Sequence, residues 1–142
     1  MAIFDPTQVS VLINGVQITD WADGSDVISV TRNEDVGAWT MGANGTGVFV
    51  SNPNKSGKLT LKVKQHSPDN KFLNKLLNGQ QNNISSQNSI SLAIRDLLNE
   101  DVVTGENGRF TTPPAYTRGN GHNPTTWTIE FEKIEIDLEN GA

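Results

Sequence analysis

Alternating apolar and polar residues predict antiparallel strands in the first part of the chain. In residues 9–19, VSVLINGVQIT, apolar side chains alternate with others on both sides of Asn14-Gly15. This dipeptide supplies the two positive-φ residues that a type I′ turn requires. The pattern therefore predicts a β-hairpin. A third strand is predicted over residues 26–32, DVISVTR.

The middle of the chain changes from the period of a strand to that of a helix. In residues 58–64, KLTLKVK, apolar side chains face one side and Lys or Thr the other, which predicts a half-buried strand. Ser67 and Pro68 then form a helix start, as cap and first helical residue. Phe and Leu recur at helical spacing, and Gly79 marks an expected end. A helix is predicted over about 67–78.

The last part of the chain again has strand periodicity. Residues 89–98, SISLAIRDLL, alternate and predict a strand, and Asn107-Gly108 indicates the turn of a second hairpin. The final segment, TWTIEFEKIEIDLENG, is the longest predicted strand. Its alternation changes phase at Glu132-Lys133, and a slip of one residue reverses the two faces of a strand. A β-bulge is therefore expected there.

Residues 33–57 fit neither period and are predicted to form a long loop. The stretch AWTMGANGTGVFVSNPNKSG within it is rich in Gly and Asn, yet it also carries several large apolar side chains. Loops beyond about 12–15 residues are usually functional or disordered. Such apolar content argues against disorder, so a functional loop is favoured.

Together these elements predict a mainly β fold, an antiparallel β-sandwich or barrel with one short flanking α-helix. The length favours a single domain over residues 1–142. The apolar fraction of 35% is low for a globular domain, where about 45–50% is usual when Gly is also counted. Such a composition suits a protein whose burial is completed by neighbouring chains.

Charge and cysteine content exclude several classes of protein. The net charge of −5 argues against a nucleic-acid clamp, because such proteins neutralise phosphates with clustered Lys and Arg. The absence of Cys excludes a disulfide framework, a thiolate metal site and a cysteine nucleophile. No apolar run approaches the ~20 residues that span a bilayer. The N-terminal MAIFDPTQ predicts no signal peptide.

The candidate chemical motifs are better explained by local structure. His66 and His122 lack further ligands at short spacing, so solvated or turn histidines are favoured over a zinc site. Asp20, Asp23 and Asp26 depart from calcium-loop spacing, and Asx turns explain them better. The segment GANGTG does not fit a nucleotide-binding loop, and no GxSxG motif is present. No enzymatic activity, cofactor or metal is expected.

Three stretches resemble the tail tube proteins of contractile-tailed bacteriophages: RNEDVGAWTMGANGTG, NKSGKLTLKVKQHSPDNKFLNKLL and TTWTIEFEKIEI. The most specific part is SGKLTLKVKQHSPDNKFLNKL, in which a Gly precedes an alternating strand and a helix led by Ser-Pro follows. The resemblance covers most of the chain and is weakest over about 99–124. It implies a structural virion protein with a β-sandwich or barrel core, a flanking helix and no catalytic residues.

The resemblance also implies partners and a location. Tail tube subunits form hexameric rings that stack into a hollow tube through which DNA passes at ejection, and the tail is assembled in the host cytoplasm. The expected partners are further copies of the chain and the sheath, baseplate or initiator, terminator and tape measure proteins. A negative chain suits a DNA conduit, because repulsion of phosphates prevents adhesion. Two alternatives stay open: an inner-tube protein of a contractile injection or secretion system, and a small β-sandwich ligand-binding module.

Two sets of site residues are predicted. The resemblance implies that the long loop reaches a neighbouring subunit or ring, so its apolar side chains are predicted inter-subunit contacts: Trp39, Met41, Val48, Phe49 and Val50. Polar alternation along two strands indicates a second, lumen-facing set: Lys62, Lys64, Glu130 and Glu132. The alternative for this second set is the solvated face of an outer sheet, which is common in antiparallel sheets.

Overall fold

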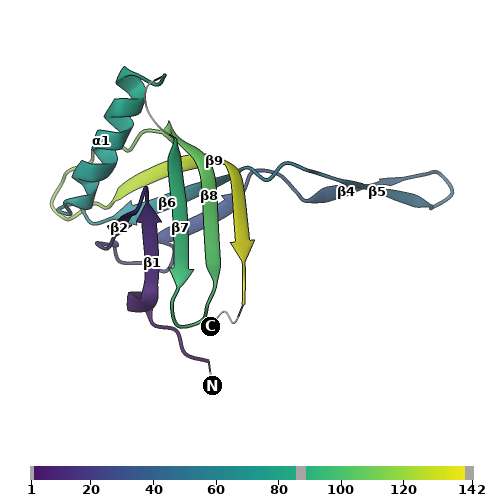
Figure 1. Ribbon diagram of the computed structural model, residues 1–142, viewed down its shortest axis with the longest axis horizontal. Helices are drawn as coiled ribbons and strands as arrows, with labels where there is room; N and C mark the ends of the chain where they lie inside the picture. Colours follow the sequence, from purple (N-terminus) through teal and green to yellow (C-terminus); the bar gives the residue numbers. More distant parts are fainter. Residues whose placement is uncertain (1, 86–88, 140–142) are drawn as a thin grey trace.

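The computed structural model describes residues 2–85 and 89–139, and a seven-stranded antiparallel sheet dominates it (Figure 1). The strand order is β2-β1-β7-β8-β9-β6-β3. The strands of this sheet are β1 Val9–Ile13, β2 Val16–Ile18, β3 Ile28–Arg32, β6 Gly57–Val63, β7 Ile90–Asp96, β8 Val102–Thr112 and β9 Thr125–Asp137. A 3₁₀ turn, Pro6–Gln8, precedes β1. The predicted mainly β, antiparallel fold with one helix is confirmed.

The sheet is rolled so that its two ends approach one another. Trp21, in the connection from β2 to β3, forms an isolated bridge with Val63 of β6. Trp21 also lines one cavity together with Val9 of β1 and Ile28 of β3. These two strands lie far apart in the strand order, and the twist of the sheet brings them close. The result is a partly closed barrel.

The core follows the predicted alternation. Along β6 the burial alternates at every position, so Leu59, Leu61 and Val63 are buried while Lys58 and Lys62 lie on the other face. The buried residues of both ends of the sheet join in one apolar cluster: Val11, Ile13, Ile18, Leu59, Leu61, Val63, Leu73, Leu77, Ile90, Leu92, Ile94, Phe110, Trp127, Ile129, Phe131 and Ile134.

Helix α1, Asp69–Asn82, begins close to the predicted start. The Ser67 hydroxyl accepts a hydrogen bond from the backbone N–H of Asp69 at 3.1 Å and donates to the Asp20 carboxylate at 2.7 Å. The predicted cap is wrong by one position, because Pro68 is the N-cap and Asp69 the first helical residue. Ser67 still satisfies the first helical N–H from one residue further out.

The predicted helix end at Gly79 is wrong, because α1 continues to Asn82. The added turn carries Gln80, whose side-chain amide bonds both backbone groups of Phe110 in β8. Its oxygen accepts from the N–H at 2.8 Å, and its nitrogen donates to the carbonyl at 2.9 Å. This tie to the sheet offsets the roughly 1 kcal/mol that a glycine costs inside a helix.

The predicted hairpin turn at Asn107-Gly108 is also wrong, because both residues lie inside β8. The Phe131 ring lies over Gly108 so closely that a Cβ there would be 2.4 Å from the ring. Asn107 has a positive φ of 56°, and the pairing of β8 with β7 shifts register near it. The dipeptide thus forms an irregularity within a strand instead of ending it.

The predicted change of face in β9 occurs, but the β8–β9 pairing has no bulge at Glu132-Lys133; its register shifts only near Phe110 and Thr112 of β8. Phe131 and Ile134 are both buried although two residues, instead of one, lie between them. Gly105 and Gly108 of β8 pair with Ile134 and Phe131 and are also buried. The β8–β9 pairing therefore keeps its register at this point. The two strands change face together.

The predicted loop over 33–57 contains a second, two-stranded sheet. Strands β4, Gly37–Met41, and β5, Gly47–Ser51, pair with each other and project away from the rolled sheet as a long hairpin (Figure 1). We refer to residues 36–52 as the arm. In the described part of the chain no helix is long and apolar enough to cross a membrane.

Candidate functional site

The arm is a regular hairpin with a glycine-dependent turn. The backbone N–H of Gly45 donates to the Gly42 carbonyl at 3.1 Å, and the Gly42 N–H donates to the Thr46 carbonyl at 2.7 Å. Gly45 has a φ of 86°, the conformation that follows the type I turn of a three-residue hairpin loop. The Asn44 side chain accepts from the Thr46 N–H at 3.2 Å and from its hydroxyl at 2.7 Å, which closes the turn.

The register of the arm places apolar side chains on both of its faces. Trp39 pairs with Phe49 on one face, with ring centroids 5.2 Å apart in an edge-to-face arrangement. The other face carries Ala38, Val48 and Val50, because successive strand residues point to opposite sides. A large part of these side chains is exposed, 66% for Trp39 and 65% for Val48.

Glycines let the large side chains of the arm fold back onto its own backbone. A Cβ at Gly37 would lie 2.4 Å from the Phe49 ring, and one at Gly47 would lie 2.5 Å from the Met41 sulfur. The aromatic face is therefore organised before any partner arrives. Trp39 and Phe49 nevertheless remain 66% and 49% exposed, so much of this face is open to solvent.

Physical reasoning indicates that the arm is an interaction surface. An isolated two-stranded hairpin is marginally stable in water at best. Its outer edges also present unpaired backbone groups, on which another chain can pair. Contiguous exposed apolar surface of this kind marks sites of protein association. The arm therefore lacks a core of its own and is suited to complete one with another molecule.

The base of the arm is held by neutral amides and one carboxylate. The Asn52 side chain donates to the Glu34 carboxylate at 2.8 Å, and the Asn52 N–H donates to the Val36 carbonyl at 2.9 Å. Hydrogen bonds from the Asn52 and Asn54 side chains hold the pKa of Glu34 below its ordinary value. Asn33 and Ser56 also bond through both backbone and side chains, at 3.1 Å each. These bonds set the direction in which the arm leaves the sheet.

The predicted lumen-facing residues do not all lie on one surface. Lys62 and Glu130 share the solvent side of the β6–β9 pair, where Lys58 stands directly opposite Glu130 and Arg109 of β8 flanks it on the other side. This face therefore alternates in charge instead of forming an acidic wall. The Lys62 amine bonds the Asp26 carboxylate at 2.9 Å.

The other two residues of that set lie apart. Lys64 follows the end of β6 and lines a cavity beside the two histidines. Glu132 lies at the change of face in β9 and accepts a hydrogen bond from the Asn107 side chain at 2.8 Å. The regular alternation ends at both residues, because β6 ends at Val63 and β9 changes face after Glu132.

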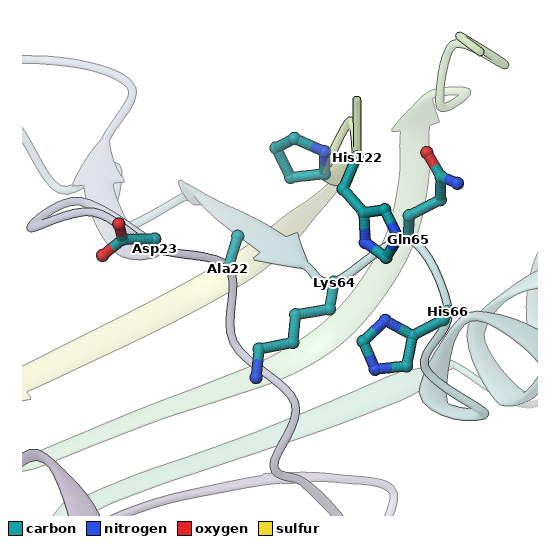
Figure 2. A pocket seen from close by; sticks show the side chains of 7 residues that line it. Ala22, Asp23, Lys64, Gln65, His66 and His122 are labelled. Carbon is teal, nitrogen blue, oxygen red and sulfur yellow. The ribbon is translucent and has the colours of Figure 1, made fainter. Parts of the chain in front are cut away.

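The fold brings His66 and His122 together, although they are distant in sequence. Their ring centroids are 5.5 Å apart and the ring planes are tilted by 57°, and both side chains line one cavity of about 400 Å³ (Figure 2). Gln65 helps to position the second histidine, because its side chain accepts from the Asn123 N–H at 3.0 Å. In the described residues no group of three or more His, Asp or Glu side chains could hold a metal ion. The arm is therefore the stronger candidate site.

Comparison with known proteins points to one class of assembly. The family model described as Bacteriophage PhiTE tail tube protein matches residues 1–139. No curated protein matches the sequence.

Solved structures of contractile injection systems share the fold. The PVC sheath/tube terminator of an extracellular contractile injection system in its extended state has a TM-score of 0.59 and 8% sequence identity, over 97% of this chain and 99% of that chain. A chain of the PVC sheath–tube complex in the extended state has a TM-score of 0.58 and 8% identity, over 96% and 92%. The tube-terminating cap of the anti-feeding prophage has a TM-score of 0.57 and 11% identity, over 97% and 93%.

Proposed function

This chain belongs to the bacteriophage PhiTE tail tube protein family, and we propose that its copies assemble into stacked hexameric rings that form the hollow tube of a phage tail. The DNA passes through the lumen of this tube at ejection. The protein acts as a structural subunit without catalytic activity. The family and the shared fold support a structural role in the tail.

The observation that carries the assembly proposal is the arm. The rings of Trp39 and Phe49 contact each other edge to face. Both side chains are exposed, and the hairpin that carries them has no core of its own. In a tube each arm packs on an adjacent subunit or ring, so that Met41, Val48 and Val50 are buried as well. The same contact repeats from copy to copy, which is the property that builds rings and tubes.

We place Lys62 and Glu130 on the lumen wall, with Lys64 and Glu132 at its rim, where β6 ends and β9 changes face. The supporting observation is the polar side of the β6–β9 pair, which is continuous across Arg109, Glu130 and Lys58. Because this face alternates in charge, repulsion of DNA is carried by the net charge of −5 per subunit. A cryo-EM map of assembled tubes with these side chains on the outer wall would contradict this placement.

The proposed partners follow from the structural neighbours and the family. The similar solved chains come from sheath–tube and terminator assemblies, so contacts with a sheath and a terminator are proposed for this chain. Baseplate or initiator proteins and a tape measure protein complete the set expected in a virion tail assembled in the host cytoplasm.

Electron microscopy and sedimentation of the purified protein test the proposal. We expect rings or tubes at high concentration or with an initiator. The change Trp39→Ser or Phe49→Ser is expected to abolish these assemblies while the monomer stays folded, because neither side chain belongs to the core cluster. A wild-type protein that stays monomeric under all these conditions would contradict the proposal.

A second candidate is a tube terminator, favoured by the likeness to the terminator and cap structures. A terminator stops after a single ring, whereas a tube subunit stacks without a fixed limit. The length distribution of the assemblies in micrographs separates the two.

A further inference from the structure

Each arm requires a receptor on its neighbour, and the molecule offers an uncharged groove beside Trp21. The groove has a volume of about 560 Å³, and its main lining residues are Phe4, Pro6, Val9, Trp21, Val27 and Ile28. A smaller cavity shares three of these residues and continues on the other side of Trp21. We refer to this surface as the Trp21 groove.

We propose that the arm of one copy inserts its aromatic face into the Trp21 groove of the next copy, in a head-to-tail contact. This inference rests on the proposed function and identifies the surface that receives the arm. The apolar surface of the arm and that of the groove are then covered by the same contact.

The walls of the groove are fixed by hydrogen bonds. On one wall the Asp5 carboxylate accepts from the Thr7 N–H at 2.9 Å and holds the turn before β1. On the other wall the Ala22 N–H donates to the Lys62 carbonyl at 3.0 Å, and the Lys62 N–H donates to the Val27 carbonyl at 2.9 Å. The groove is therefore present before binding, which lowers the entropy that association must offset.

The two surfaces match in charge. Residues 37–51 contain no Asp, Glu, Lys or Arg, and none of the residues that line the groove is charged. Each copy carries a net charge of −5, so two copies repel one another through most of their surfaces. Contact between two uncharged surfaces avoids both this repulsion and the desolvation of ions.

The two surfaces also match in size and chemistry. The Trp39–Phe49 pair presents two aromatic side chains, and such side chains bury roughly 150–250 Å² each. In the groove, Trp21 offers a further aromatic ring, surrounded by Phe4 and aliphatic side chains. A preformed concave apolar site with an aromatic anchor is the usual arrangement of an interface centre.

The placement of the two surfaces favours open-ended assembly. Strands β1 and β2, beside the groove, lie on one side of the rolled sheet, and the arm projects from the opposite side (Figure 1). A contact between two different surfaces is heterologous and repeats around a ring or along a tube. Arm-to-arm pairing would instead end at a dimer and leave the groove empty.

A mixing experiment with two variants tests this contact. The arm variant is Trp39→Ser/Phe49→Ser, and the groove variant is Phe4→Asp/Ser25→Asp, at positions that are exposed in the monomer. Each alone is expected to stay monomeric at ten times the concentration at which the wild type assembles. The arm variant keeps an intact groove and the groove variant an intact arm, so a mixture should give a 1:1 heterodimer and nothing larger in analytical ultracentrifugation.

The control variant Asn74→Asp/Asn78→Asp adds the same charge on the exposed face of α1 and should assemble as the wild type does. A groove variant that assembles normally while the arm variant does not would overturn the groove assignment and leave the proposed function intact. An arm variant that assembles normally would overturn the proposed role of the arm itself. A mixture of two monomeric variants that forms no heterodimer would also overturn the contact.

Cross-linking provides a second, independent readout, because the natural chain has no cysteine. The variant Ser51→Cys/Ser25→Cys keeps the Trp39–Phe49 pair, and Ser51 is an exposed residue on the same face of the arm; it should form intermolecular disulfides on mild oxidation and give a ladder of oligomers in non-reducing gels. The matched pair Ser51→Cys/Asn78→Cys should give none above the background of single-cysteine variants. Equal ladders from both pairs would contradict the proposal.

Discussion

Strands β5 and β6 are consecutive in the sequence but differ in the burial of their apolar side chains. In β6 apolar residues occupy one face only, and Leu61 is fully buried between β3 and β9. In β5 apolar residues occupy both faces, and every residue of the strand is exposed. In β6, which has one polar face, the apolar side chains pack in the subunit's own core. In β5, which has apolar side chains on both faces, these side chains need another molecule to bury them.

The largest difference between the two regions is expected in stability. Trp127→Ala should lower the free energy of unfolding by about 3–5 kcal/mol, because the side chain is buried and donates to the Asn70 side chain at 3.0 Å. Phe49→Ser in the arm should change the same free energy by less than about 0.5 kcal/mol, as is usual for exposed sites. Urea denaturation of the monomers measures both. A comparable loss in the Phe49 variant would show that the arm belongs to the subunit's own core.

Two glycines extend the comparison to smaller effects. Gly108→Ala places a Cβ 2.4 Å from the Phe131 ring and 3.0 Å from the Ile90 carbonyl, and such overpacking should cost about 1–3 kcal/mol. In Gly45→Ala the added Cβ has no other atom within 4 Å. Only the positive φ of residue 45 disfavours alanine there, by about 1 kcal/mol. The first should lower the midpoint of global unfolding. The second should leave that midpoint unchanged and speed amide exchange within the arm, and a global effect of Gly45→Ala would contradict the independence of the arm.

The body of the fold could be predicted from sequence because its strands alternate between apolar and polar faces. Residues 9–19 and 58–64 carry this pattern plainly, and the strands that it predicts agree with the structure to within a residue or two. The pattern does not predict the arm, because apolar residues on both faces hide the period of two. Its turn signal, Asn44-Gly45, is of the same kind as the Asn14-Gly15 signal that marks the first hairpin.

The same dipeptide at Asn107-Gly108 shows the limit of local signals. There the Phe131 ring over Gly108 and the pairing of β8 with both neighbours decide the structure, and no local pattern encodes that packing. The arm residues could be selected from their apolar excess alone. The Trp21 groove could not, because Phe4, Trp21 and Ile28 come from separate segments that only the rolled sheet brings together.

The smallest expected effect concerns two carboxylates, one in each region. Neutral side-chain amides of Asn52 and Asn54 lower the pKa of Glu34 at the base of the arm. The pKa of Glu135 in β9 is lowered mainly by the hydrogen bond and charge of Lys133, at 3.2 Å, and also by Lys55. Each stabilising contribution is present above the ordinary pKa of the group and is lost as the pH falls through its lowered value.

Salt distinguishes the two carboxylates, because it screens charges but not hydrogen bonds from neutral amides. Raising the ionic strength should move the pKa of Glu135 back towards its ordinary value and leave that of Glu34 in place. NMR titration of the side-chain carboxyl carbons measures both. The variant Glu34→Gln should abolish the acid-induced shifts of amides at the base of the arm and leave those around Glu135 unchanged. Equal salt responses would mean that charge, and not the amide bonds, lowers the pKa of Glu34.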